Sequence, residues 1–591
     1  MTQIKDYSKT ISQELGLKEL QVRNTSSLID SGSTIPFISR YRKELTGSLD
    51  EVMVGKIRDR LNQLRELDKR RDAILESIKE QGKLTDELKD MILSAQSLSV
   101  LEDLYLPYKP KRRTKATVAK EKGLEPLAKL IFEQKAIALE NEAKKYINAE
   151  KKVASVEEAL AGARDIIAEW INEDAALREK LRKLFREEAV LKTKIITGKE
   201  EAGVNFKDYY DFSEIAHKSP SHRILASRRG EKEGFLTLRV LPAEVKAFEI
   251  IISHCLRAKN SCAEQVKESC IDSYKRLLSP SLETEYRVEL KLRADQEAIS
   301  IFGKNLKNLL MAPPMGQKKV MAIDPGLRTG SKVVCLNEQG KLLDHTTIFL
   351  LSENGQGEAA DKICSLYKKY SIEVIAIGNG TGSRETENFL KGIEELTDVK
   401  TIMVSETGAS VYSASECARE EFPDHDVTVR GAVSIGRRLM DPLSELVKID
   451  PKSIGVGQYQ HDVDQRLLKN ALDDIVESCV NSVGVEVNTS SKELLTYVSG
   501  LGPARAKAII DFRNEKGKFK ERKNISQVPG LGPKAVEQAI GFLRIFDSPN
   551  PLDKSAVHPE AYPIVEAMAK TIGQPIERLI GNSEIVNKID I

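Results

Sequence analysis

The sequence predicts a multidomain, mainly α-helical protein with one α/β domain and a pair of helical hairpins near its C-terminal end. Three observations lead to this prediction. Apolar residues recur at helical spacing over most of the chain. From Val320 onward, short apolar strands alternate with helices. A turn built from glycine and proline occurs twice near the C-terminal end. At 591 residues the chain has room for about three to five domains.

The N-terminal region, residues 1–200, is predicted to be helical throughout. Its clearest signal is an amphipathic pattern at Ile57, Leu61, Leu64, Leu67, Ile74 and Ile78 among many charged residues. Ser155 and Glu158 have capping-box spacing, which indicates a helix that runs past Trp170 towards Phe185. The middle region, 201–315, also favours helices, and the residues Met311–Gly316 end that pattern at a domain boundary.

Two stretches of the N-terminal region are candidates for contacts with phosphate. Residues 34–44, TIPFISRYRKE, mix aromatic side chains with a basic cluster. Five of the seven residues in 109–115 are basic, and they include Lys111, Arg112 and Arg113. A solvated turn that simply carries charge explains each stretch equally well.

An α/β domain is predicted for residues 316–450. Three consecutive strands, at 320–323, 332–336 and 346–350, come first. A helix at 359–370, a strand at 374–377, a helix at 385–395 and a strand at 401–404 follow. This order indicates a mixed sheet.

The repeated turn lies in residues 463–546, ahead of a C-terminal helical segment, 547–591. The residues Val498–Pro503 and Val528–Pro533 read VSGLGP and VPGLGP and lie thirty positions apart. Each precedes an apolar-periodic segment, and proline at the first helical position loses no hydrogen bond. Glycine has no side chain, so its backbone can approach a ligand closely. The glycines of the two turns are Gly500, Gly502, Gly530 and Gly532.

The charge around these turns suits an anion. The first turn of a helix directs free N–H groups and a positive dipole end outward, and Arg505, Lys507 and Lys534 add positive charge there. Residues 491–546 contain 11 Lys and Arg against 5 Asp and Glu, in a chain whose net charge is only +2. The pair resembles a tandem helix-hairpin-helix DNA-binding module that holds phosphates without recognising bases. The alternative is a pair of hairpins whose glycines only permit close helix packing.

Composition excludes several other classes of protein. No apolar run approaches the ~20 residues of a membrane span, and residues 1–15 lack the apolar stretch of a secretory signal. The seven cysteines are scattered without a C-x-x-C pair, so we expect a reduced cytoplasmic setting, no zinc ribbon and no bound metal.

Long motifs identify a resemblance that extends over essentially all 591 residues. TIPFISRYRKELTGSLDE, LEDLYLPYKPKRRTKATVA and SPSHRILASRRGEKEG resemble the Tex family of bacterial RNA-binding transcription accessory proteins. The resemblance implies binding to DNA or RNA and RNA polymerase or a transcription complex as partner. It also implies a C-terminal OB-fold RNA-binding domain, which the residues up to Ile591 do not supply. A shortened chain and a natural short form both explain this, and strong RNA binding by that domain is not expected here.

The α/β region resembles a ribonuclease-H-like fold. Residues 320–330, VMAIDPGLRTG, are similar to the first-strand motif of its RuvC/YqgF branch. In that branch two Mg²⁺ ions need three or four converging carboxylates. Asp324 matches the first, but Asn379 stands where the second is expected. Glu385, Glu406 and Asp441 are weaker candidates.

Two functional hypotheses follow for this domain. A non-catalytic scaffold without a cofactor is favoured, because a neutral amide at Asn379 leaves a paired-cation site short of charge. The alternative is a Mg²⁺-dependent, structure-specific nuclease. A protein-docking platform, with the basic hairpins against acidic partners, is a third possibility.

Overall fold

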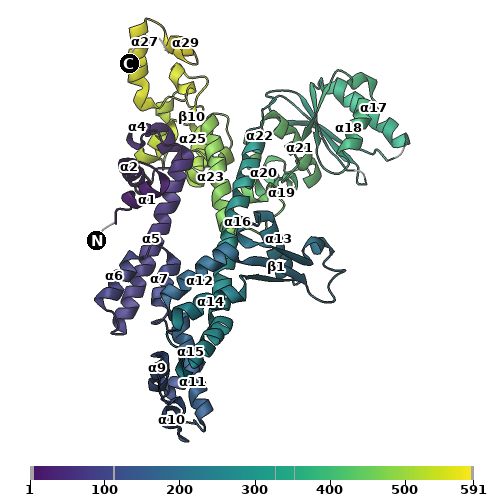
Figure 1. The fold of residues 1–591 in the computed structure, drawn as a ribbon. Coiled ribbons are helices and arrows are strands. Elements are labelled where there is room, and N and C mark those ends of the chain that lie inside the picture. The colour runs from purple at the N-terminus through teal and green to yellow at the C-terminus, as the bar shows by residue number, and fades with distance from the viewer. Residues whose placement is uncertain (1–4, 111–112, 327, 352, 587–591) are drawn as a thin grey trace. The chain divides into compact units, whose positions relative to one another are not determined.

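The computed structural model describes residues 5–110, 113–326, 328–351 and 353–586. Most of the described chain is helical, and its largest sheet has five strands (Figure 1). The predicted fold class, mainly α with one α/β domain, is therefore confirmed. The chain divides into two compact units, one of residues 1–61, 299–460 and 464–591 and one of residues 62–298 and 461–463. Each unit has buried hydrophobic clusters of its own.

The second unit is built mainly from helices. They are α6 (Asp86–Ser94), α7 (Leu98–Tyr105), α8 (Lys115–Glu121), α9 (Glu125–Phe132), α10 (Leu139–Lys144), α11 (Val156–Glu173), α12 (Ala175–Glu188), α13 (Ser221–Lys232), α14 (Glu244–Cys255) and α15 (Ser261–Asp272), with most of α5 (Glu51–Glu80) and the first part of α16 (Ser279–Leu310). The amphipathic pattern predicted from Ile57 to Ile78 lies in α5. Ile74 and Ile78 pack in one hydrophobic cluster with α6 and α7.

The helix predicted from Ser155 towards Phe185 is in fact two helices. Ser155 caps α11 as expected, since its side chain accepts a hydrogen bond from the backbone of Glu158 at 3.2 Å. The helix ends at Glu173, and Asp174 is extended with ψ 106°. The Asp174 carboxylate then accepts from the backbone N–H of Leu177 at 2.9 Å and starts α12. An aspartate that can cap a new helix interrupts the helical pattern here.

The prediction of helices alone up to residue 310 is also wrong. The strands β1 (Val190–Ile195), β2 (Asp211–Ile215) and β3 (Leu236–Leu241) form an antiparallel sheet in the order β2-β1-β3. In β1 the side chains of Leu191 and Thr193 are buried, while Lys192 is exposed. This two-residue period is the strand signal, and it is short enough to be overlooked between strongly helical segments.

The α/β domain has the predicted mixed sheet, in the order β6-β5-β4-β7-β8. Its strands are β4 (Val320–Asp324), β5 (Ser331–Leu336), β6 (Leu342–Ile348), β7 (Val374–Gly378) and β8 (Lys400–Val404). The first three strands pair antiparallel, and β7 and β8 continue parallel to β4. The third strand begins four residues earlier than predicted, because the chain reverses within Asn337–Gly340, where the backbone N–H of Gly340 donates to Asn337.

Helices cover both faces of this sheet. On one face Ala322 and Leu336 pack with α21 (Val427–Met440). On the other face Met321 and Ile323 pack with α17 (Glu353–Tyr370) and α18 (Ser383–Lys391). Successive residues of β4 point to opposite faces, so a fully apolar strand has a buried partner on each side.

The remaining helices of the first unit lie near the two ends of the chain, except α19, α20 and α22, which lie beside α21 (Figure 1). They are α1 (Ser8–Leu15), α2 (Glu19–Asp30), α3 (Ile35–Tyr41), α4 (Lys43–Thr46), α19 (Ala409–Ala414), α20 (Glu416–Glu421), α22 (Pro442–Leu446), α23 (Gln465–Val483), α24 (Lys492–Thr496), α25 (Gly502–Lys516), α26 (Pro533–Ile540), α27 (Tyr562–Ile572), α28 (Ile576–Leu579) and α29 (Ser583–Val586). The short strands β9 (Val485–Glu486) and β10 (Leu543–Arg544) pair in parallel across the hairpin region. Among the helices of the described residues, none is both long and apolar enough to cross a membrane.

Candidate nucleic-acid interface

The two glycine turns share a backbone hydrogen bond but differ at the second glycine, where φ is +67° at Gly502 and −70° at Gly532. In the first, the backbone N–H of Leu501 donates to Val498 at 3.0 Å, and in the second Leu531 donates to Val528 at 3.2 Å. The turns lead directly into α25 and α26, and each helix has one proline within its first two positions. Within the described chain no side chain caps either helix. At α26 the N–H groups of Ala535 and Val536 already donate to the carbonyl oxygen of Gly532, so the N–H of Lys534 is the first-turn donor that remains for solvent or a ligand.

The four glycines of the turns differ in their surroundings. A Cβ atom at Gly500 would lie 2.8 Å from the Cβ of Gln538 on α26, so this glycine allows the two hairpins to pack together. At Gly502, Gly530 and Gly532 a Cβ would meet no heavy atom of the described chain within 4 Å. The backbone at these three positions faces open space. Close helix packing thus explains Gly500, whereas Gly502, Gly530 and Gly532 leave the backbone open to a ligand.

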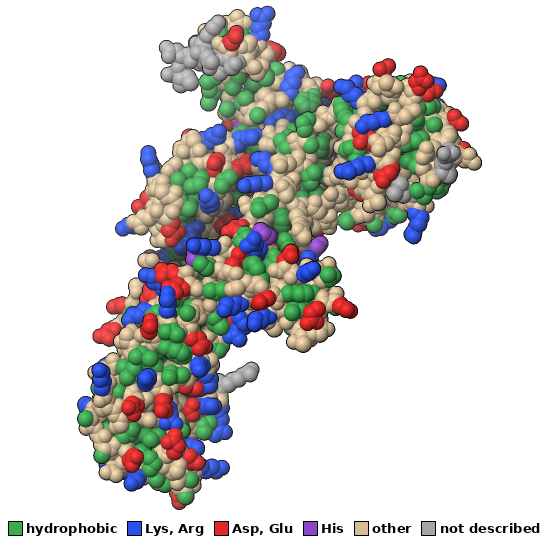
Figure 2. Space-filling view, turned by 45° about the vertical axis from the view of Figure 1, so that its right-hand side comes forward, with side chains coloured by type: hydrophobic (Ala, Val, Ile, Leu, Met, Phe, Trp, Pro, Cys, Tyr) green, Lys and Arg blue, Asp and Glu red, His purple; other side chains and the backbone are tan. Residues whose placement is uncertain are grey.

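Three exposed cations lie on the first turns of these helices. The guanidinium of Arg505 donates to the carbonyl oxygen of Gly500 at 2.8 Å, which fixes it beside the first turn. Lys507 and Lys534 are exposed. On the face drawn in Figure 2, basic and acidic side chains are interspersed, in keeping with the net charge of +2. Local placement of charge therefore matters more here than the net charge of the chain.

Other basic residues of the hairpin segment support the fold. Arg522 is only 1% exposed, and its guanidinium donates to the carbonyl oxygens of Leu543, Ser555 and Val557. Arg544 is also buried. Because these two charges are shielded from the surface, the net positive charge of residues 491–546 is larger than the positive charge exposed to a ligand.

The basic cluster at residues 34–44 has a structural role, and the solvated turn considered for it is wrong. Most of it forms α3, in which Phe37 and Ile38 are buried. The Tyr41 hydroxyl donates to the carbonyl oxygen of Gly541 at 2.6 Å, and Arg40 donates to that of Asn481 at 2.9 Å. This segment docks on the hairpin region.

Arg42, the next residue of that segment, is also committed to contacts within the protein. Its guanidinium pairs with the carboxylates of Glu537 and Glu560, on or close to the hairpin region. The same group lies 4.6 Å from the centre of the Phe37 ring. Arg42 is therefore not a free contact for phosphate.

The basic stretch at 109–115 is only partly described. Lys111 and Arg112 lie outside the described residues. The Arg113 side chain is 70% exposed and pairs with the carboxylate of Glu121 at 2.7 Å. Lys109 lies 4.0 Å from the carboxylate of Glu102. Exposed pairs of this kind are weak, so these cations can exchange partners.

A pair of carboxylates lies at the C-terminal edge of the five-stranded sheet. Asp324 ends β4 and Glu406 follows β8. Burial, together with the nearby charge of Glu406, raises the pKa of Asp324 to about 6. Asn379 lies between them in the order of the strands, and its side-chain oxygen accepts from the backbone N–H of Glu406 at 3.1 Å. A Cβ at Gly380 would collide with the Glu406 carboxylate in the position that it occupies here.

The other candidate acids do not join this pair. Asp441 caps α22 by accepting from the backbone N–H of Ser444 at 3.0 Å. It follows α21, whose Gly431 lies beside Asp324, and ten helical residues place Asp441 about 15 Å away. Glu385 is exposed on the first turn of α18. Within the described chain no three His, Cys, Asp or Glu side chains come together as a metal site.

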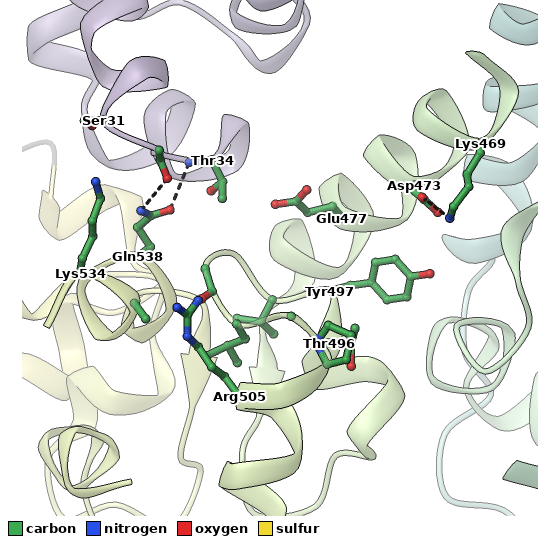
Figure 3. A pocket seen from close by; sticks show the side chains of 17 residues that line it. Ser31, Thr34, Lys469, Asp473, Glu477, Thr496, Tyr497, Arg505, Lys534 and Gln538 are labelled. Carbon is green, nitrogen blue, oxygen red and sulfur yellow. Dashed lines mark hydrogen bonds and ion pairs between the residues drawn. The ribbon is translucent and has the colours of Figure 1, made fainter. Parts of the chain in front are cut away.

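A groove of ≈ 830 Å³ runs beside the first glycine turn (Figure 3). The turn contributes Gly500 and Gly502, and the first turns of the two hairpin helices contribute Arg505 and Lys534. The full set of lining residues is Ser31, Gly32, Thr34, Lys469, Asp473, Glu477, Thr496, Tyr497, Val498, Gly500, Leu501, Gly502, Pro503, Arg505, Lys534, Ala535 and Gln538. A segment from the start of the chain therefore shares this site with the hairpins.

Gln538 joins the N-terminal part of the groove to the second hairpin. Its side chain accepts from the backbone N–H of Thr34 at 3.1 Å and donates to the carbonyl oxygen of Gly32 at 3.2 Å. The opposite wall is α23, which contributes Asp473 and Glu477. These residues could not be predicted from the sequence, because no motif links positions 31–34 or 469–477 to the glycine turns.

Comparison with known protein families assigns the parts of the chain. Residues 5–79 match the "Tex-like protein N-terminal domain", 134–302 the "Tex central region-like" family and 318–440 the "Tex protein YqgF-like domain". Residues 480–544 match a "Helix-hairpin-helix motif", and 550–591 match an "HHH domain". The last match was not anticipated, since the sequence of 547–591 had indicated only a helical segment.

Several curated proteins are similar over nearly the whole chain. Protein YhgF of Escherichia coli is 48% identical over 98% of this chain and 76% of its own length. The transcriptional accessory protein Tex of Neisseria gonorrhoeae is 45% identical over 99% of this chain and 78% of its own length. Protein tex of Bordetella pertussis is 47% identical over 99% of this chain and 76% of its own length. With the three Tex-type matches, this similarity shows that the chain belongs to the Tex family.

Proposed function

We propose that this chain binds nucleic acid without sequence specificity and acts as an accessory to transcription. The observation that carries the proposal is the pair of glycine turns, at which Gly502, Gly530 and Gly532 face open space beside uncapped helix starts. Backbone N–H groups at such turns hold phosphate oxygens, which are the same for every base sequence. Arg505, Lys507 and Lys534 would add charge-assisted contacts.

The role in transcription rests on the relatives and not on the site. One relative is named a transcriptional accessory protein, and we extend that role to this chain, with RNA polymerase or its complex as the expected partner and the cytoplasm as the expected location. DNA and RNA are both candidate ligands, because the phosphate backbone is common to them.

We further propose that the ribonuclease-H-like domain is a non-catalytic scaffold. Two Mg²⁺ ions need three or four carboxylates at one place, whereas Asp324 and Glu406 are accompanied by the neutral side chain of Asn379. This donor set does not fit a two-metal centre, and Asp441 lies at the far end of α21. The nuclease alternative retains one observation in its favour, the adjacent carboxylates of Asp324 and Glu406.

One experiment tests both proposals. Binding to duplex DNA, single-stranded DNA and RNA is measured by fluorescence anisotropy over a range of salt concentrations, with and without Mg²⁺. We expect affinity to fall by roughly 40-fold between 50 and 200 mM salt if three cations meet phosphates on duplex DNA. Little dependence on base sequence is expected. A flat salt response would refute the phosphate contacts, and cleavage that Asp324→Asn abolishes would refute the scaffold.

A further inference from the structure

The groove beside the first glycine turn has two chemically different sides (Figure 3). Arg505 and Lys534 lie near the glycine turn and the start of α26. Glu477 comes from α23 and points into the groove opposite Thr34, and Tyr497 comes from the segment that leads to the first turn. The α23 side also carries Lys469, which is paired with Asp473. In Figure 3 the Glu477 carboxylate points towards Thr34 and the Tyr497 ring points towards Asp473, so an acceptor and a flat apolar surface lie at different points of the groove, and each suits the base of a nucleotide.

Glu477 presents a carboxylate to this groove. Among the described residues, no hydrogen bond or ion pair reaches its carboxylate, although it is largely shielded from solvent. Burial and the neighbouring carboxylates of Asp474, Glu51 and Asp473 raise the pKa of Glu477 to about 7, while Arg58 opposes the shift. A shielded carboxylate in a groove is costly unless a donor reaches it. The exocyclic amino groups of adenine and cytosine are donors of this kind.

Tyr497 offers a flat apolar surface in the same groove. Burial raises the pKa of its hydroxyl to about 12, so the ring is uncharged at neutral pH. The backbone carbonyl of Tyr497 accepts from the side chain of Asn481 at 2.9 Å, which anchors the residue to α23. Bases that have left a duplex stack on fixed aromatic rings of this type.

The dimensions favour a single strand over a duplex. The volume of ≈ 830 Å³ lies within the range of about 300–1,000 Å³ that is typical of pockets for small ligands. One or two nucleotides fit inside such a space, whereas a double helix could only lie across its mouth. On the α23 wall the side chain of Asp473 accepts from Lys469 at 2.7 Å, so this lysine is already engaged and does not offer a free contact to a second phosphate backbone.

We propose that this groove binds an unpaired nucleotide of a strand whose phosphate is held at the first glycine turn, with its base against Tyr497 and its amino group at Glu477. The inference rests on the proposed function of the hairpins and adds the ligand class: a junction between duplex and single strand, or a single-stranded end. Such ends occur in both DNA and RNA.

The test compares blunt duplexes with duplexes that carry a short single-stranded overhang, in DNA and in RNA, using the full chain. We expect an adenine or cytosine overhang to tighten binding about tenfold, because one stacked base contributes on the order of 1–3 kcal/mol. An abasic overhang keeps the phosphates and loses the bases, so it should bind like the blunt duplex.

Two matched pairs of variants locate the effect. Tyr497→Leu should abolish the gain from the overhang and Tyr497→Phe should keep it, because phenylalanine still stacks. Glu477→Gln should reduce the preference for adenine and cytosine over thymine, whereas Lys492→Gln, an exposed residue of α24 outside the groove, should not. Unchanged affinity for the blunt duplex shows that each variant has folded.

The outcomes separate this inference from the function on which it rests. If blunt duplex binding is salt-dependent but overhangs give no gain, or if the gain survives both Tyr497→Leu and an abasic overhang, the nucleotide site is refuted and the hairpin proposal stands. If no duplex form binds in a salt-dependent way, the hairpin proposal itself fails.

Discussion

Gly532 provides the cleanest test of the backbone contacts. It lies before α26 with φ −70° and ψ 163°, a conformation that any residue can adopt. A Cβ there meets no heavy atom of the described chain within 4 Å. Aspartate and asparagine are good residues for this N-cap position, so Gly532→Asp and Gly532→Asn should leave stability unchanged or raise it by a few tenths of a kcal/mol.

The two variants should differ in binding. An added carboxylate about 4 Å from a phosphate costs about 1 kcal/mol in water, which corresponds to roughly fivefold weaker binding. Gly532→Asp should show this loss at low salt and should recover part of it as salt rises. Gly532→Asn, which adds the same bulk without charge, isolates the steric effect and should bind more tightly than Gly532→Asp.

Gly500→Ala serves as the contrasting variant. Its φ is +77°, and the added Cβ would lie 2.8 Å from the Cβ of Gln538, so we expect a loss of about 1–3 kcal/mol in the free energy of unfolding. Denaturant titration measures stability, and fluorescence anisotropy with a labelled duplex measures affinity. If Gly532→Asp binds at low salt as tightly as the parent, no phosphate approaches this turn and the reasoning is refuted.

Three further outcomes are expected. Arg522→Lys should lower the free energy of unfolding by about 2–4 kcal/mol in denaturant titration, because lysine cannot reach all the carbonyl oxygens to which the buried guanidinium donates. An unchanged free energy of unfolding would contradict this. Replacing Lys507 and Lys534 by glutamine should reduce the salt slope of duplex binding by about two, and an unchanged slope would remove them from the interface. The pKa of Asp324 is raised from 3.8 to about 6, so the parent protein should lose stability as pH rises between these two values. We expect a loss of about 1–2 kcal/mol in the free energy of unfolding after solvent screening. Asp324→Asn should remove this loss when unfolding is measured at both pH values.

Local patterns were sufficient to predict much of the fold. Helical periodicity predicted α5, and apolar strands in sequence predicted the five-stranded sheet. The glycine–proline turns predicted where α25 and α26 begin. Each of these signals lies within a few residues of the element that it specifies, which is why one sequence was enough.

The missed features depend on contacts between distant residues. The strand β1 was missed because its six residues follow long helices, and its pairing with β3 gives no local signal. The basic appearance of residues 34–44 did not indicate that Tyr41 contacts Gly541, 500 positions away. For the same reason the groove residue Glu477 could not be predicted, since only folding brings α23 beside the glycine turn.

The docking of α3 on the hairpin region has a consequence for how the chain is made. Tyr41 and its acceptor on Gly541 are separated by 500 residues. At about 5–20 residues per second, a ribosome needs roughly 25–100 s to synthesise that interval. Throughout that time the apolar side chains of Phe37 and Ile38 lack their final neighbours. Early emergence of α3 thus creates a period in which chaperones can bind it, and its contact with the hairpins forms only after the intervening 500 residues have been made.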